Sequence, residues 1–385
     1  MTDPAIQTSL PIIGEAREAP SGVLPTQALR ALIDRGEIQA LSEISAAQIQ
    51  PASLDLRLGE VAYRVPASFL PGKHSKVEDK VRALAEDRID LTAGAVLEKG
   101  QVYIARLQET LRLKKRHSAI ANPKSSTGRL DVFARVITDY GTEFDNVRDR
   151  YSGPLWVEIA PRSFNVRVRT GSRLVQVRIK RGTPPSNETF LRRLDDALRL
   201  VRAEDGSADI IDGAYAITVD IRGDPVSRVV GYKAKSTAEV IDLEKINHYE
   251  PARFWDPVYR PDEHGIVLAP DEFHILASNE LIAVPPEYAA DMVAYDTLVG
   301  EFRVHYAGFF DPGFGYAGGD AVGTRAVLEV RSHEVPFMIE HGQVVGRLMV
   351  DRLIQESEKP YGSGIGSSYN RQGLTLSKHF KRAPL

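Results

Sequence analysis

The residues best suited to binding an anion lie at positions 122–129, NPKSSTGR. The hydroxyl groups of Ser125 and Ser126, with backbone N–H groups at a glycine-containing turn, can form a nest for an anion. Lys124 and Arg129 can add charge-assisted hydrogen bonds, which suit a phosphate chain. The spacing departs from the GxxxxGK phosphate loop. Composition alone favours a solvated polar turn, and phosphate binding is the alternative.

A second candidate is an aromatic hairpin at positions 305–315, HYAGFFDPGFG. Its Asp-Pro-Gly sequence, which begins at Asp311, is typical of a tight turn. Phe314 and the neighbouring phenylalanines can form a stacking wall, while backbone groups near Ala307 can read the edge of a base. The alternative is a hairpin whose rings only cover a hydrophobic core, and residue types alone favour that alternative.

Two glutamates, Glu158 and Glu329, occur within otherwise apolar stretches, LWVEI and AVLEV. Each could be solvated, form half of a structural ion pair, or be a buried carboxylate with a raised pKa that acts as a base. A glutamate on a strand is most often solvated, but its occurrence in both stretches weakens that interpretation.

The Gly-rich tail at positions 361–373, YGSGIGSSYNRQG, contains Tyr369 and Gln372. A mobile segment that offers a ring for stacking and an amide for hydrogen bonding suits a lid over a ligand. A frayed chain terminus explains the same composition equally well.

The composition of the 385-residue chain excludes several classes of protein. Without cysteine it has no disulfide, thiolate zinc site, iron–sulfur cluster or cysteine nucleophile, and it is not a zinc nucleobase deaminase. A net charge of −3 gives no field that favours nucleic acid or a membrane as a partner. Because no signal-peptide pattern and no apolar window of about 18 residues occur, we expect a cytoplasmic protein.

The elements that must position these residues are mostly short strands. Alternating apolar residues predict strands at 53–58 (SLDLRL) and 164–168 (FNVRV). Helical spacing predicts a helix with Thr26 as its N-cap and an amphipathic helix over residues 186–204. The predicted organisation is an N-terminal arm at 1–25, a first domain at 26–182, a helical linker at 183–206 and a second domain at 207–385.

The β pattern repeats along the chain at a constant interval. The same interval separates the members of three pairs of residues in equivalent strand and turn contexts: Glu109 and Glu280, Glu158 and Glu329, and Gly171 and Gly342. A shared register over so long a stretch is harder to obtain by chance than one match, although β proteins with regular turns resemble themselves. We therefore predict two copies of one β-barrel in tandem.

The order of these motifs resembles that of the deoxycytidine triphosphate deaminase branch of the trimeric dUTPase superfamily. Residues 49–59, IQPASLDLRLG, are similar to the early strand motif of that family. PKSSTGR resembles its phosphate-binding RSSxxR motif, with Lys124 where arginine is usual. HYAGFFDPGFG resembles its HxAGxxDPGF hairpin, AVLEV supplies the glutamate that follows, and SYNRQG resembles its C-terminal lid.

The resemblance implies a mainly β fold of tandem dUTPase-like β-barrels, of the β-clip type, with a few short helices. It implies hydrolytic deamination of dCTP to dUTP and ammonia without zinc, feeding dUMP and dTTP synthesis. A glutamate would be the general base for the water that attacks C4, with support from a serine and an arginine. The family also implies Mg²⁺ bound with the triphosphate, dTTP as an inhibitor and a homo-oligomer.

The sequence is also compatible with other functions. A dUTP diphosphatase, or a bifunctional enzyme that releases dUMP and pyrophosphate, would use the same pocket with water placed at the α-phosphate. The divided motifs also allow a non-catalytic regulator that binds deoxynucleotides. A purely structural β-barrel protein would need none of Ser125, Arg129 and Glu329.

Carried onto this chain, the roles known for the family fall into two groups. The catalytic residues would be Ser125 and Arg129, together with one of the two glutamates. The substrate-binding residues would be Lys124, Ser126, Ala307, Asp311, Phe314, Tyr369 and Gln372. No residue is assigned as a metal ligand.

The choice of base depends on how the two copies share the motifs. The first copy keeps PKSSTGR, but its hairpin, TDYGTEFDNVRDRYSG, lacks DPGF. The second copy keeps DPGF, but its phosphate position reads AYDTLVGEF. Our hypothesis is a composite site, with the phosphate-binding motif from the first copy and Glu329 as base from the second. The rival is a site between first-copy barrels of different chains, with Glu158 as base.

Overall fold

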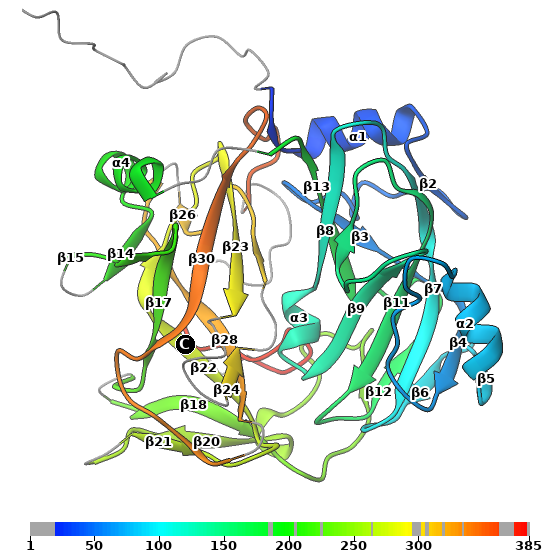
Figure 1. The fold of residues 1–385 in the computed structure, drawn as a ribbon. Helices are drawn as coiled ribbons and strands as arrows, with labels where there is room; N and C mark the ends of the chain where they lie inside the picture. The colour runs from blue at the N-terminus through cyan, green and yellow to red at the C-terminus, as the bar shows by residue number, and fades with distance from the viewer. Residues whose placement is uncertain are drawn as a thin grey trace, which may run out of the picture.

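Two β-rich halves lie side by side in the computed structural model (Figure 1). The structure describes residues 20–183, 188–203, 206–223, 226–262, 265–294, 302–304, 308–317, 320–332, 335–361 and 373–382. The elements of the first half are β1 (Gly22–Val23), α1 (Thr26–Asp34), β2 (Ile38–Ala40), β3 (Leu54–Leu56), β4 (Leu58–Val65), α2 (Val77–Leu84), β5 (Asp87–Asp90), β6 (Ala95–Leu97), β7 (Val102–Arg112), β8 (His117–Pro123), α3 (Ser125–Gly128), β9 (Val132–Thr138), β10 (Asn146–Val147), β11 (Ser152–Pro161), β12 (Val166–Val168) and β13 (Val175–Arg181).

The second half begins with the longest of its helices, and strands follow. Its elements are α4 (Glu188–Leu198), β14 (Val201–Ala203), β15 (Gly206–Ser207), β16 (Ile210–Ile211), β17 (Ala214–Asp220), β18 (Val229–Ala234), β19 (Ile241–Asp242), the 3₁₀ turn η1 (Pro251–Arg253), β20 (Trp255–Tyr259), β21 (Ile266–Leu268), β22 (Phe273–Ile282), β23 (Tyr288–Ala294), β24 (Phe302–Val304), β25 (Phe309–Phe310), β26 (Tyr316–Ala317), β27 (Asp320–Ala321), β28 (Thr324–Ser332), β29 (Phe337–Ile339) and β30 (Val344–Arg352).

Each half is built by the same antiparallel pairing. In the first, β7 pairs with β4 and β11, and β8 pairs with β13. In the second, β22 pairs with β18 and β28, and β23 pairs with β30. The alternation in SLDLRL explains β3, since Leu54 and Leu56 enter the hydrophobic core while Asp55 between them points to the opposite face.

The predicted repeat is present in the structure. Three strands of the second half lie at the same distance along the chain from their counterparts in the first half as Glu280 lies from Glu109. They are β21, β23 and β29, which correspond to β6, β8 and β12, and each begins and ends at the equivalent residue. Gly171 and Gly342 have the same left-handed backbone, with φ of 86° and 79°, and glycine adopts this conformation at little cost. The predicted tandem of two mainly β barrels is therefore confirmed.

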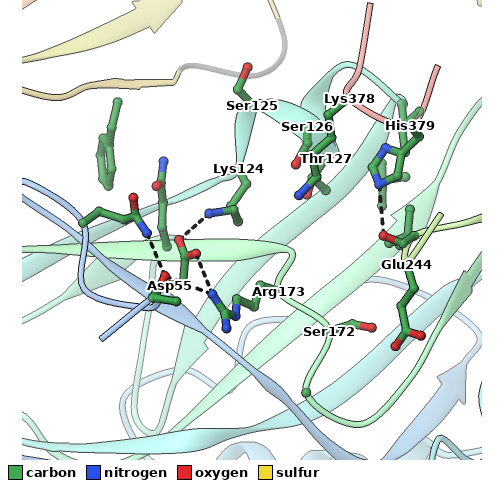
Figure 2. A pocket seen from close by; sticks show the side chains of 18 of the residues that line it. Asp55, Lys124, Ser125, Ser126, Thr127, Ser172, Arg173, Glu244, Lys378 and His379 are labelled. Carbon is green, nitrogen blue, oxygen red and sulfur yellow. Dashed lines mark hydrogen bonds and ion pairs between the residues drawn. The ribbon is translucent and has the colours of Figure 1, made fainter. Parts of the chain in front are cut away.

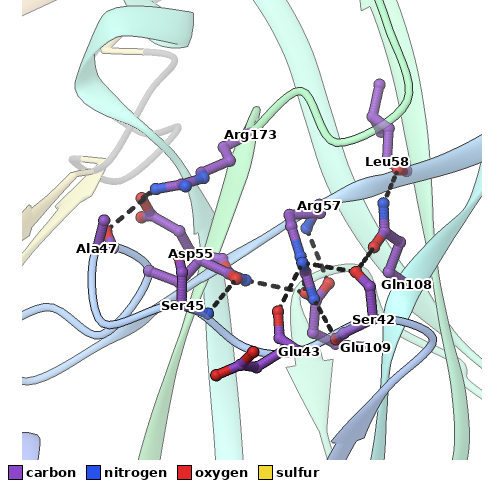
Figure 3. A network of polar contacts seen from close by, with 11 residues as sticks. Ser42, Glu43, Ser45, Ala47, Asp55, Arg57, Leu58, Gln108, Glu109 and Arg173 are labelled. Atoms are coloured by element: carbon purple, nitrogen blue, oxygen red, sulfur yellow. Dashed lines mark hydrogen bonds and ion pairs between the residues drawn. The ribbon is translucent and has the colours of Figure 1, made fainter.

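The repeated pair Glu109 and Glu280 has a structural role in both copies. Each carboxylate is buried and accepts a backbone N–H from a neighbouring segment, at 2.8 Å from Arg57 and 2.9 Å from Thr218. Figure 3 shows the first-copy network, in which the Arg57 guanidinium also donates to Glu109. A buried carboxylate with such partners satisfies backbone groups that would otherwise lose their hydrogen bonds.

Two local predictions about helices were wrong. Thr26 is the first residue of α1 and not its cap, because its hydroxyl donates to the carbonyl oxygen of Gln50 at 2.9 Å. The helix expected over residues 186–204 ends at Leu198, and Val201 begins β14, where it pairs with Ile282. Tertiary pairing with β22 overrides the helical spacing of Val201.

The two halves share an extensive interface. β19 from the second half extends the edge of β12 in parallel, with Val166 opposite Ile241. Aromatic side chains of the second half enter the core of the first, and Trp255 meets Phe164 edge to face with ring centroids 5.4 Å apart. Residues 373–382 also pack there through Phe380. Each barrel is therefore positioned by the other.

Within the described part of the chain, no helix combines the length and the apolar character needed to cross a membrane.

Candidate active site

A small cavity between the halves joins motifs from both copies. Its volume is about 90 Å³, and Ser125 of α3 lines it. Figure 1 shows α3 between the strands of the two halves. The first copy lines it with residues of the PKSSTGR motif, and the second with the hairpin and β28. The members that matter most are Lys124, Ser125, Arg129, Asp311, Phe314 and Glu329.

A larger cavity of about 820 Å³ adjoins the small one and shares Lys124 and Ser125 with it (Figure 2). Its lining is rich in cationic side chains, since Arg173, Lys359 and Lys378 contribute alongside Lys124. Ammonium and guanidinium groups next to hydroxyl groups are the donors that bind phosphate oxygens. The two cavities together offer one small compartment and one larger compartment rich in cationic side chains.

Asp55 pairs with two of the cationic side chains that line the larger cavity. Its buried carboxylate forms ion pairs with Lys124 and, at 3.6 Å, with Arg173, and Figure 2 draws both. Burial, together with the charge of Lys124, lowers the pKa of Lys378. Our sequence analysis did not assign Asp55, Arg173 or Lys378 to the site. The alternation in β3 could have indicated Asp55, but no pattern singles out Lys378.

The PKSSTGR motif is held in place by its local fold and by the C-terminal segment. Lys124 is extended, with φ of −66° and ψ of 145°, and α3 follows. The Arg129 guanidinium donates to the carbonyl oxygen of Thr375 at 2.9 Å, and the Ser377 hydroxyl donates to that of Ser126 at 2.8 Å. A segment from the end of the chain therefore fixes a turn that lies far earlier in the sequence.

Glu329 lies on β28 with only 4% of its surface exposed. The Arg129 Nε lies 4.0 Å from the Glu329 carboxylate, so the two copies meet at this pair. Burial raises the pKa of Glu329 to about 8, while the positive charge of Arg129 opposes that rise. A carboxyl group of this kind takes up and releases a proton near neutral pH, which a general base requires.

Asp311 is anchored by a buried arginine from the other copy. Arg178 on β13 is fully buried and donates to Asp311 at 2.9 Å and to the carbonyl oxygen of Ala290 at 3.0 Å. It also pairs with Asp291, and its guanidinium lies 4.1 Å from the centroid of the Phe309 ring. Burial raises the pKa of Asp311, and Arg178 opposes this rise.

The hairpin needs its glycines because the chain folds tightly against its neighbours. Gly315 has φ of 77°, and a Cβ atom there would lie 2.1 Å from the carbonyl oxygen of Ile282. The turn brings the Phe310 and Phe314 rings edge to face, with centroids 4.9 Å apart, and Phe314 lies 5.8 Å from Tyr361. These rings form an apolar wall of the small cavity.

Glu158 lies elsewhere and lines neither cavity. It is 1% exposed, and the Arg135 guanidinium donates to it at 3.1 Å and 2.5 Å. The same guanidinium lies 3.7 Å from the centroid of the Phe144 ring. Of the three explanations raised from the sequence, a structural ion pair fits this geometry, and a catalytic role for Glu158 stays a prediction.

Three predicted substrate-binding residues, Ala307, Tyr369 and Gln372, lie outside the described residues. Apart from Glu158, the structure brings the other predicted residues of both copies to the two adjoining cavities, with Ser126 lining the larger one.

The described residues do not form a cage for a magnesium ion. They contain no group of three or more His, Cys, Asp or Glu side chains placed to hold a metal. The nearby carboxylates of Asp55 and Asp311 are engaged by Lys124 and Arg178. The cationic side chains that line the larger cavity are suited to phosphate oxygens.

Comparison with known proteins agrees with these motifs. Residues 20–183 match the family model described as the 2′-deoxycytidine 5′-triphosphate deaminase N-terminal domain, and residues 187–380 match the model of the C-terminal domain. A dCTP deaminase, dUMP-forming, from Beutenbergia cavernae is 32% identical over 196 residues, which are 47% of this chain and 92% of that protein.

A solved structure extends the similarity to most of the chain. The crystal structure of 2′-deoxycytidine 5′-triphosphate deaminase from Agrobacterium tumefaciens is 47% identical, with a TM-score of 0.83. The match covers 87% of this chain and 99% of that chain. Both family models together span nearly all described residues. The chain therefore belongs to the 2′-deoxycytidine 5′-triphosphate deaminase family.

Proposed function

We propose that this protein hydrolyses dCTP to dUTP and ammonia at a composite site formed by its two copies within one chain. The observation that carries the proposal is the pairing of Arg129 from the first copy with Glu329 from the second, 4.0 Å apart in an enclosed cavity. Family membership supplies the substrate class, since the related proteins are named dCTP deaminases.

In the proposed reaction, Glu329 removes a proton from a water molecule that attacks C4 of the cytosine ring. The Arg129 guanidinium stabilises the charge that develops, and the Ser125 hydroxyl holds the water. Glu329 then returns the proton to the 4-amino group, which leaves as ammonia. The remaining proton of the C4 hydroxyl moves to N3, so that the C4 oxygen becomes a carbonyl. Its pKa of about 8 suits both proton transfers, because the group can exist in either form near neutral pH.

The triphosphate would lie in the larger cavity. Lys124 and Ser126 supply a cation and a hydroxyl at its entrance, and Arg173 and Lys378 add two further cations that we assign to the phosphates. A magnesium ion would arrive on the phosphate oxygens, and we assign it no protein ligand. dTTP would inhibit by occupying the same two cavities.

The nucleoside would lie against the hairpin. Phe314 offers a ring face, and Asp311, held by Arg178, offers a carboxylate toward the sugar or the base. We keep Ala307, Tyr369 and Gln372 as proposed contacts from the family pattern, the last two in a lid. We also keep the domain limits given above and a homo-oligomer as proposals.

A second candidate is the bifunctional reaction that continues to dUMP and pyrophosphate. It is favoured by the names of the relatives from Beutenbergia cavernae and Salinispora tropica, each described as dUMP-forming and each 32% identical in the matched region. Incubation of the purified protein with dCTP and magnesium separates the two, with nucleotides resolved by ion-exchange chromatography. Ammonia with dUTP supports the first reaction, dUMP with pyrophosphate supports the second, and absence of ammonia contradicts both.

A further inference from the structure

β28 presents a second charged residue to the first copy, two positions after Glu329. Leu328 and Val330 enter the core of the second copy, so Glu329 and Arg331 share the opposite face of the strand. Arg331 is only 2% exposed. Its guanidinium therefore has to find partners within the interface between the copies.

Those partners come mainly from the turn that carries Arg129. Arg331 pairs with the fully buried Asp131, which lies two residues after Arg129. The Ser163 hydroxyl donates to the same carboxylate oxygen of Asp131 at 2.6 Å and lies 3.3 Å from the Arg331 guanidinium. Arg331 also donates to the carbonyl oxygen of Asp271. The network spans both copies.

Two ion pairs of opposite polarity thus connect the same two segments. Arg129 faces Glu329, and Asp131 faces Arg331. Sliding β28 by two residues would set Arg129 against Arg331 and bury two like charges together, which is strongly unfavourable. The charge pattern therefore specifies one register of β28 against the turn.

The turn that carries Arg129 and Asp131 is held in place by backbone hydrogen bonds. Asp131 has a left-handed backbone with φ of 56°, and its N–H donates to the carbonyl oxygen of Gly128 at 2.8 Å. Its own carbonyl oxygen accepts the N–H of Arg162, also at 2.8 Å. These backbone hydrogen bonds hold in place the short segment that joins Asp131 to Arg129.

We propose that the Asp131–Arg331 pair, completed by Ser163, is a positioning device that sets the separation between the Arg129 guanidinium and the Glu329 carboxylate. It rests on the proposed function, because those two groups are the ones assigned to the reaction. The pair touches neither cavity, so its effect on the reaction is indirect.

The decisive variant is the double substitution Asp131→Asn and Arg331→Met. It removes both buried charges, so it leaves no unpaired ion, and asparagine tolerates the left-handed backbone at position 131. Arg331→Met alone would leave a buried carboxylate and lower Tm. We expect the double variant to recover Tm relative to Arg331→Met, yet to keep a kcat reduced about tenfold or more, because a misplaced reactive pair slows the chemical step. KM for dCTP should change by less than about threefold.

A matched control breaks another ion pair between the copies. Lys180 on β13 pairs with Asp351 on β30, and neither residue lines either of the two cavities described above. Asp351→Asn should lower Tm and leave kcat at the wild-type value. Wild-type kcat in the double variant would overturn the proposal, and so would an equal loss of kcat in Asp351→Asn, since that would indicate general loosening.

A direct readout separates this proposal from the proposed function. The pKa of Glu329, followed by ¹³C NMR of its carboxyl carbon, should rise in the double variant as Arg129 moves away. The charged or titratable groups that line the small cavity with Glu329 are Lys124, Arg129, Asp311, Arg325 and Tyr361, and its cross-strand neighbour on β22 is the apolar Ile275. If the wild-type protein releases no ammonia from dCTP, the proposed function fails. An unchanged pKa of Glu329 in the double variant would refute the positioning role by itself.

Discussion

Replacing Arg129 by methionine removes the cation that lies 4.0 Å from the Glu329 carboxylate. Both side chains are at least nine-tenths buried, so water screens the pair only weakly. With an effective dielectric constant of about 20, the attraction at that distance is worth about 4 kcal/mol. Its loss lowers the ionised fraction of Glu329 at a fixed pH on the order of a thousandfold.

The assay is the pH dependence of kcat/KM for ammonia release from dCTP. Because Arg129 opposes the effect of burial, its removal raises the pKa of Glu329 above about 8. The acid limb of the profile should therefore move to higher pH in Arg129→Met. Arg129→Lys, which keeps the charge, should move it much less. A profile of unchanged shape, lowered equally at every pH, would refute the role of Arg129 in tuning Glu329.

Three further predictions concern single residues. The folded-state pKa of Glu329, about 8 against an ordinary 4.5, favours the folded protein fully below about pH 4.5, and this stabilisation is lost as the pH rises to about 8. The free energy of unfolding, measured with urea at several pH values in that range, should therefore fall as the pH rises in the wild type. This contribution should be missing in Glu329→Gln. Lys124→Met should raise KM for dCTP about tenfold or more with a smaller change in kcat, measured by steady-state kinetics, because one phosphate cation is lost. Glu158→Gln should lower the unfolding free energy by about 1–3 kcal/mol in the same urea assay, because its hydrogen bond to Arg135 is weakened. It should leave kcat unchanged, and a loss of kcat would favour the rival site with Glu158 as base.

The repeat could be predicted because its signals are local and strong. Gly171 and Gly342 each adopt a left-handed backbone in equivalent turns of the two copies. Strands separated by the same interval begin and end at equivalent residues. The motif residues that meet in the small cavity were also identifiable, since each motif carries its own short pattern. Val201 was misassigned because its spacing suits a helix equally well and only pairing with Ile282 decides for a strand.

Contacts between distant segments could not be predicted in the same way. Arg331 and Asp131 are 200 residues apart, and nothing in either local sequence indicates that they meet. The same holds for Arg178, which reaches Asp311 across 133 residues, and for Lys378 at the larger cavity. These residues depend on how the two barrels dock, and docking is a property of the whole interface.

The most direct test of the composite site compares ammonia release from dCTP by Glu329→Gln and Glu158→Gln, with dCTP binding measured by calorimetry for each. We predict that Glu329→Gln still binds dCTP but releases no ammonia above background, while Glu158→Gln has wild-type turnover. Full activity in Glu329→Gln, or its loss in a folded Glu158→Gln, would contradict the assignment of the base to the second copy.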